Sequence, residues 1–162
     1  MKKLNLEHLK ILLSLINSSP YFRLLKMEIK EIGIGYSILE TDVENIHLNP
    51  FGSIHGGVYS STIDTAAYWA AYCGIEEEVG LISMDLNINN LAPITKGKLI
   101  VKGKCIKNGR TICLSEALVI NEKGNCLAHG TSKLLVSKNL QTINQISKFM
   151  DKKNLHLPPK FI

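Results

Sequence analysis

The fold class of this chain is decided by residues 56–73, GGVYSSTIDTAAYWAAYC. After its two opening glycines this stretch contains neither Gly nor Pro, and its Ala-rich second half favours a helix. Because the helix is apolar almost all round, we expect it to lie inside the protein with other segments wrapped around it. The same region isolates one charge, since Asp64 is the single formally charged residue between Glu44 and Glu76.

Alternating apolar and polar residues downstream of this helix supply the wrapping strands. Residues 81–91 alternate most cleanly, with an expected inner face of Ile82, Met84, Leu86 and Ile88. Asn108-Gly109 predicts a type I′ turn, which would join two neighbouring strands as a hairpin. The other strands of the expected antiparallel meander cover residues 98–107, 110–121 and 126–137.

Short alternations also occupy residues 27–43, where Gly33 and Gly35 predict two strands joined by a tight turn or a bulge. Apolar residues at helical spacing predict a further helix near each end of the chain, over residues 4–17 and 139–153. About six strands with one long inserted helix give an α+β fold, a curved antiparallel sheet wrapped round a central helix.

The length of 162 residues favours one domain. We therefore expect a single domain over residues 1–162, with a core at about 25–137, the N-terminal helix at 4–17, and a C-terminal helix and tail at 138–162.

Composition excludes several classes of protein. The 45% hydrophobic and 20% charged residues are typical of globular proteins, and a net charge of +5 is too small to indicate nucleic-acid binding. No apolar run approaches the ~18 residues of a membrane span, and Glu7, His8 and Lys10 interrupt what would otherwise resemble a signal peptide. Four cysteines without a C-x-x-C pair favour a reducing compartment over disulfides or a closed zinc site. We expect a cytoplasmic protein that binds neither metal, membrane nor nucleic acid.

Asp64 is the sharpest candidate for chemistry. On a helix it shares one narrow polar stripe, at spacings of three and four, with Gly57, Ser60, Ser61 and Tyr68. An unpaired carboxylate costs several kcal/mol in apolar surroundings, so it must be partnered, solvated or functional. A structural role would have it bonded to Ser60 or Ser61, or placed at a wet subunit interface.

The residues just before this stripe form a second candidate. His55-Gly56-Gly57 opens the helix with bare backbone N–H groups, which together with the helix dipole can hold an anion or a developing oxyanion. The glycines could instead permit a tight turn or close packing. Gly57 and Asp64 lie about 10 Å apart along a helix, too far for one carbonyl to touch both. A donor from one subunit and a carboxylate from another would remove this difficulty.

At this point the sequence resembles a known family. Asn49-Pro50-Phe51-Gly52-Ser53-Ile54-His55-Gly56-Gly57, followed by Asp64, is similar to the N-x-x-G-x-x-H-G-G…D signature of hotdog-fold acyl-CoA thioesterases of the phenylacetic-acid-degradation (PaaI-like) type. The resemblance continues through Ser83 to Asn87, Pro93 and Gly97, and spans roughly residues 25–137. It implies a hotdog fold and hydrolysis of an aryl- or fatty-acyl-CoA to the free acid and coenzyme A, without a cofactor.

The resemblance also implies roles for individual residues. Asp64 would be general base or nucleophile, and Gly56 would donate its N–H to the thioester oxygen. Asn49 and His55 would help to place the water or the thioester, and Ser83 would lie beside the carboxylate. Family members pair subunits so that their sheets join, which implies a homodimer or homotetramer with sites shared between chains.

A basic stretch from Lys96 to Arg110 contains no acidic residue. Lys102, Lys104 and Arg110, together with Gly57 at the helix start, are candidates for binding the substrate, the basic residues through coenzyme A phosphates. The lysines are better explained as the solvated face of a strand, because Lys98, Lys102 and Lys104 recur at period two.

Two other functions fit parts of the sequence. A hotdog module could bind acyl-CoA without turnover, as a sensor, although no helix-turn-helix precedes the domain. A hotdog dehydratase is disfavoured because its usual His-containing loop and acidic helix pattern are not found.

Overall fold

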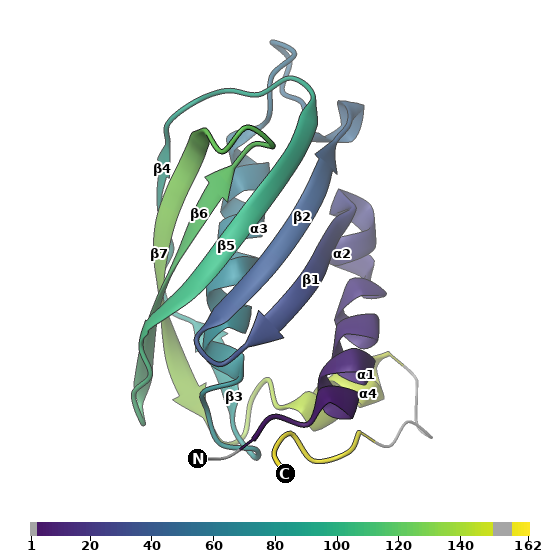
Figure 1. Ribbon diagram of the computed structural model, residues 1–162, viewed down its shortest axis with the longest axis vertical. Helices are drawn as coiled ribbons and strands as arrows, with labels where there is room; N and C mark the ends of the chain where they lie inside the picture. The colour runs from purple at the N-terminus through teal and green to yellow at the C-terminus, as the bar shows by residue number, and fades with distance from the viewer. Residues whose placement is uncertain (1–2, 151–156) are drawn as a thin grey trace.

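The long apolar helix is present as α3, which spans Gly56–Tyr72. In the computed structural model, which describes residues 3–150 and 157–162, α3 lies along the concave side of one curved sheet (Figure 1). Its side chains Ile63, Ala67 and Ala70 are completely buried. In β5, Gly103 faces this helix so closely that a Cβ there would overlap the carbonyl oxygen of Ala66. This glycine therefore lets the backbones of helix and sheet approach directly.

The sheet is antiparallel throughout, with its strands in the order β1-β2-β5-β6-β7-β3 and with β4 also paired to β7. The strand bounds are Met27–Gly33 (β1), Tyr36–Val43 (β2), Gly80–Ser83 (β3), Asn87–Asn90 (β4), Gly97–Lys107 (β5), Ile112–Ile120 (β6) and Cys126–Ser137 (β7). β3 and β4 pair with successive parts of β7, so the seven strands occupy six positions. The predicted α+β fold, with its curved sheet of about six strands, is confirmed.

The predicted strand over 81–91 is wrong in one respect, because it is interrupted between β3 and β4. Asp85 accepts from the backbone N–H of Lys133 at 2.9 Å and from its Nζ at 2.7 Å, replacing ladder bonds with side-chain bonds. The break alters the expected inner face. Leu81 is fully buried there, whereas Met84 is 56% exposed.

The predicted type I′ turn is also wrong. Four residues, 108–111, separate β5 from β6, and the strand register shifts between Cys105 and Lys107. Gly109 does not take the positive φ that such a turn requires. Asn108 instead donates from Nδ2 to the carbonyl of Gly74, which ties this loop to the end of the central helix.

The remaining helices are α1 (Leu6–Asn17), α2 (Pro20–Leu25), the short 3₁₀ helix η1 (Asn45–His47) and α4 (Ile143–Phe149). The first two lie along the β1 side of the sheet (Figure 1), and Asn17 exchanges two hydrogen bonds with the backbone of Ile29. The sequence did not predict α2, where Pro20 occupies the first turn and starts a helix rather than only ending one. The predicted C-terminal helix is confirmed over α4, while its last expected residues, 151–153, lie outside the described chain.

Residues 157–162 pass beside the start of α1 and reach the end of α3, and we call this segment the C-terminal strap. Its Lys160 side chain is 1% exposed and donates from Nζ to the carbonyls of Tyr72 (3.3 Å), Ile75 (2.8 Å) and Glu76 (3.1 Å). A buried cation thus caps the carbonyl end of the central helix, where the helix dipole favours positive charge.

The strap is also held by His8 of α1. Its Nδ1–H donates to the Pro158 carbonyl at 2.7 Å, and its Nε2 accepts from the Tyr72 hydroxyl at 2.8 Å. Burial lowers the pKa of His8, which favours the neutral ring that these two bonds require. The strap, α1 and α3 are therefore joined by one buried polar cluster.

We expect Lys160→Met to destabilise the protein by about 3 kcal/mol, because it removes a buried cation from the end of α3 and takes the Nζ donor from the carbonyl of the buried residue Ile75. For a chain of this size this corresponds to a fall in melting temperature of roughly 10 °C. Lys10→Met, on the exposed face of α1, is the control and should change it by no more than about 2 °C. Equal melting temperatures for the two variants would contradict this account of Lys160.

Candidate active site

Asp64 lies half-buried in the middle of α3, and its carboxylate has a partner on the sheet. Ser83, the last residue of β3, donates from Oγ to Asp64 Oδ1 at 2.9 Å. This bond fixes the position of one carboxylate oxygen and leaves the other oxygen of Asp64 available to act as a base or a nucleophile.

The neighbouring serines do not satisfy the carboxylate. Ser60 Oγ donates to the carbonyl of Gly56 at 3.1 Å, and Ser61 Oγ donates to that of Gly57 at 2.8 Å. Both hydroxyls are thus engaged with the helix backbone. The structural alternative for Asp64, in which these hydroxyls hold it, is not what the geometry shows.

Asp64 opens onto a cavity of about 770 Å³, which we call the acid cavity. Its other walls are largely apolar and come from α1, α2, α3, α4 and the segment between β3 and β4, including Ile16, Phe22, Trp69, Leu86, Ile146 and Phe149. Tyr68 lies on the same wall, where burial, with a smaller contribution from the Asp64 charge, raises its pKa to about 12. A carboxylate beside an apolar cavity is the arrangement expected for a reaction at the polar end of an apolar group.

The start of α3 distinguishes the two glycines of the motif. His55 is the N-cap, and its Nδ1 accepts from the Gly57 N–H at 2.8 Å, while the Val58 N–H donates to the His55 carbonyl. Among the described residues, none accepts from the Gly56 N–H. Gly56 therefore keeps a donor available at the positive end of the helix, whereas the donor of Gly57 is already used.

Gly56 lines a second cavity of about 290 Å³, together with Asn49, Tyr59 and Asn90. We call this the loop cavity. Asn49 shapes its wall, since its Oδ1 accepts from the Phe51 N–H at 2.9 Å. Gly52 closes the same turn with a φ of +79°, a conformation that favours glycine. This explains the spacing of Asn and Gly in the motif.

The acid cavity and the loop cavity are separate within one chain. Asp64 and Gly56 are eight residues apart on one helix, about 12 Å along its axis. No described residue lines both cavities. One chain therefore presents the carboxylate and the free N–H at two different places.

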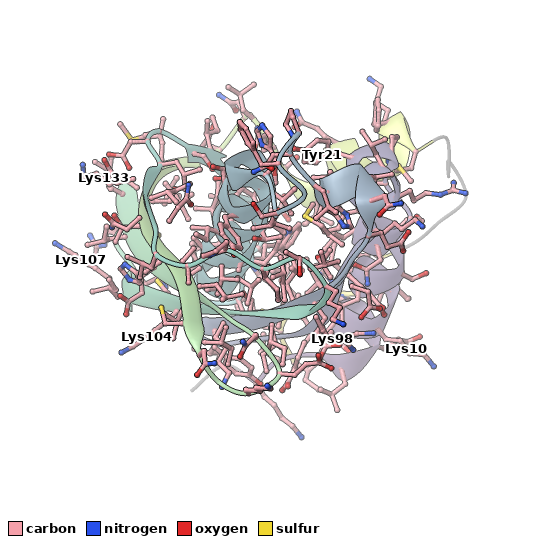
Figure 2. The ribbon with its side chains drawn as sticks, turned by 90° about the horizontal axis from the view of Figure 1, so that it is seen from above. Lys10, Tyr21, Lys98, Lys104, Lys107 and Lys133 are labelled. Carbon is pink, nitrogen blue, oxygen red and sulfur yellow. The ribbon has the colours of Figure 1, made fainter. Side chains whose placement is uncertain are left out.

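The basic candidates lie elsewhere. Lys102 and Lys104 are exposed on β5, on the outer face of the sheet, and Lys104 pairs in register with Glu116 of β6. Figure 2 shows Lys104 and Lys107 projecting outward from the sheet, away from Tyr21. Arg110 lies in the loop between β5 and β6. None of the three lines the acid cavity or the loop cavity, so their binding to a phosphate stays a prediction.

Some residues that line these cavities were not predicted from the sequence. Asn90 packs against Gly56 so closely that a Cβ on Gly56 would lie 2.9 Å from the Asn90 Nδ2, yet nothing in the sequence singled out Asn90. The contributions of α2 and α4 to the acid cavity depend on contacts between segments far apart in the chain. No local pattern reports such contacts.

Within residues 3–150 and 157–162, no three or more His, Cys, Asp or Glu side chains are grouped in a way that could hold a metal ion. None of the helices described here is long and apolar enough to cross a membrane.

Comparison with known proteins agrees with this fold. A family model described as the thioesterase superfamily matches residues 51–128, which include the motif from Phe51 to Gly57, Asp64 and Ser83. Acyl-coenzyme A thioesterase 13 of Homo sapiens is 29% identical over 98 residues, covering 59% of this chain and 69% of that protein. The proofreading thioesterase EntH of Klebsiella pneumoniae is 29% identical over 105 residues, covering 59% and 75%.

A solved thioesterase of Haemophilus influenzae superposes with a TM-score of 0.73 at 25% identity, covering 78% of this chain and 88% of that one. The fold, the motif and the family model agree. The chain has the hotdog fold, and its sequence is similar to the thioesterase superfamily over residues 51–128.

Proposed function

We propose that this protein hydrolyses acyl-CoA thioesters to a carboxylic acid and free coenzyme A. The observation that carries the proposal is the Asp64 carboxylate, held by Ser83 at 2.9 Å and facing an apolar cavity of about 770 Å³. The relatives named as thioesterases support the same class of reaction.

The chemistry follows from the groups available. A backbone N–H at Gly56 polarises the thioester carbonyl and stabilises the oxyanion that forms there. Asp64 either takes a proton from the attacking water or attacks the carbonyl itself, with water then releasing the acid. In both routes the C–S bond breaks and the coenzyme A thiolate leaves and takes up a proton. The chain's own groups supply each of these functions, and we propose that coenzyme A enters only as part of the substrate.

We further propose that the site forms between two subunits. Gly56 and Asp64 line different cavities of one chain, so a partner must bring its Gly56 to this Asp64. The outer edge of β4 pairs with no described strand, and the exposed side chains Met84 and Leu91 flank it. An unpaired edge next to exposed apolar residues is a natural contact for a second copy.

The test is release of free thiol from a panel of aryl- and fatty-acyl-CoAs by the purified protein. Turnover of at least one substrate supports the proposal. Tight stoichiometric binding without turnover would instead establish an acyl-CoA-binding module and overturn it.

A further inference from the structure

Asn90, the last residue of β4, places a second hydrogen-bond donor beside the free N–H of Gly56. Alternation along this short strand puts Asn90 on the same face as Ile88, which packs against the core. A Cβ on Gly56 would lie only 2.9 Å from the Asn90 Nδ2, and both residues line the loop cavity. Two donors from different elements of one chain therefore meet at one wall of that cavity.

We propose that Asn90 is a further catalytic residue, whose side-chain amide binds the thioester oxygen together with the Gly56 N–H. The inference rests on the proposed function and adds a second donor to that site. Three observations carry it: the spacing of the two donors, the unused amide of Asn90, and the contacts that hold the end of β4 against α3.

The spacing lets one oxygen reach both nitrogens. By standard covalent geometry a Cβ lies about 2.5 Å from the N of its own residue, so the Gly56 N and the Asn90 Nδ2 are at most roughly 5.4 Å apart. An oxygen that accepts from two N–H groups at about 2.9 Å each can bridge donors up to about 5.8 Å apart. The two donors are thus close enough to stabilise one oxyanion.

The amide of Asn90 is not used by the fold. Within residues 3–150 and 157–162 its Nδ2 donates to no protein acceptor, and the side chain is exposed in the single chain. An oxyanion carries more negative charge than water or a ground-state carbonyl oxygen, so it gains more from the same N–H. A donor of this kind therefore stabilises the transition state more than the bound substrate.

Contacts on two sides hold the end of β4 in place. Asn90 pairs in register with Ala128 of β7. Two residues later, the Ala92 N–H donates to the Leu127 carbonyl at 3.0 Å, and the Ala92 carbonyl accepts from the Tyr59 hydroxyl at 2.9 Å. Because Tyr59 belongs to the first turn of α3, these bonds tie the strand end to the start of the helix. The two donors are therefore positioned before substrate binds.

The first experiment measures kcat and KM for thiol release by variants of Asn90. We expect Asn90→Ala to lower kcat about 10²-fold with little change in KM, because the lost bond is stronger in the transition state than in the bound substrate. Asn90→Asp keeps the size of the side chain but has no N–H at neutral pH, so its loss should be at least as large. Asn89→Ala, on the opposite face of β4, is the matched control and should leave kcat unchanged.

A double-mutant cycle with Gly56 separates a shared oxygen from a merely structural role. Gly56→Ala alone should lower kcat about tenfold, since its Cβ displaces the Nδ2 of Asn90. In the Asn90→Ala background the same substitution should have no further effect, because no amide is left to displace. Equal losses from Gly56→Ala in both backgrounds, or a wild-type kcat in Asn90→Ala, would overturn the inference.

A spectroscopic measurement decides the inference without turnover. Octanoyl-CoA and benzoyl-CoA, labelled with ¹³C at the thioester carbonyl, are bound to Asp64→Asn, and their C=O stretch is measured by difference infrared spectroscopy. Hydrogen bonds polarise the carbonyl and lower this frequency, so adding Asn90→Ala should raise it and adding Asn89→Ala should not.

This measurement also distinguishes the inference from the proposed function. If the stretch depends on Asn90 but the wild type hydrolyses no substrate, the proposed function fails and the inference stands. If Asn90→Ala leaves the stretch of a bound thioester unchanged, the inference fails whether or not the wild type turns over. A protein that binds neither thioester would refute both.

Discussion

Asp64→Asn should lower kcat about 10³-fold on any acyl-CoA that the wild type hydrolyses. The amide keeps the size of the side chain and can still accept from Ser83, but it can neither take a proton from water nor attack a carbonyl. Substrate binding should change little, since the apolar cavity is left intact. Single-turnover and steady-state thiol release separate these two effects.

Asp85→Asn is the matched control for this loss. Its carboxylate lies two residues beyond Ser83 and is bound by Lys133, whose hydrogen bonds lower the pKa of Asp85. This variant removes a carboxylate outside the acid cavity and should leave kcat unchanged. The assignment fails if Asp64→Asn turns over as fast as the wild type. The melting temperature of Asp64→Asn should equal or exceed that of the wild type, because this substitution removes a half-buried charge.

Gly56→Pro should lower kcat by about 10² to 10³ relative to Gly56→Ala, since removing one oxyanion donor has an effect of this size. Proline suits the first position of a helix, and the preceding His55, at φ −74° and ψ 133°, already has the extended conformation that proline favours before it. Both variants introduce the same Cβ next to Asn90, so alanine controls for that contact. Only the proline removes the N–H.

Equal kcat values for the proline and alanine variants would exclude Gly56 as the donor. Melting temperatures of the two should agree within a few degrees, which separates the loss of a donor from misfolding.

The same variants test whether the site is shared. Coexpressed Asp64→Asn and Gly56→Pro chains should recover about one quarter of wild-type activity, because half of randomly paired dimers are mixed and each mixed dimer has one intact site of two. If both groups acted within one chain, the mixture would be no more active than either variant alone.

Much of this fold can be predicted from the sequence, because the patterns that indicate its helix and strands are local. The apolar stretch of α3 has few stable alternatives to burial, and the strands of the meander alternate with period two. The stripe of Ser60, Ser61 and Asp64 was likewise predicted from helical spacing, and all three line one cavity.

Other features depend on geometry that spacing does not encode. Which glycine of the motif keeps a free N–H is decided by the orientation of the His55 ring. The break between β3 and β4 results from bonds of Asp85 to Lys133, 48 residues away. Lysine side chains are usually exposed, so only the fold shows that Lys160 is buried at the end of α3.

The contacts of the C-terminal strap form later in folding than the pairings of the sheet. All sheet pairings are available once Ser137 has been synthesised, whereas Lys160 must reach a carbonyl 88 residues earlier and Pro158 a histidine 150 residues earlier. Contacts so distant in sequence form late in folding, because the chain must lose the entropy of closing a long loop before these contacts can stabilise it. A nascent chain therefore completes its hydrogen-bonded sheet before its acid cavity has a finished wall, and we expect amide exchange in α4 to be faster than in β6 and β7.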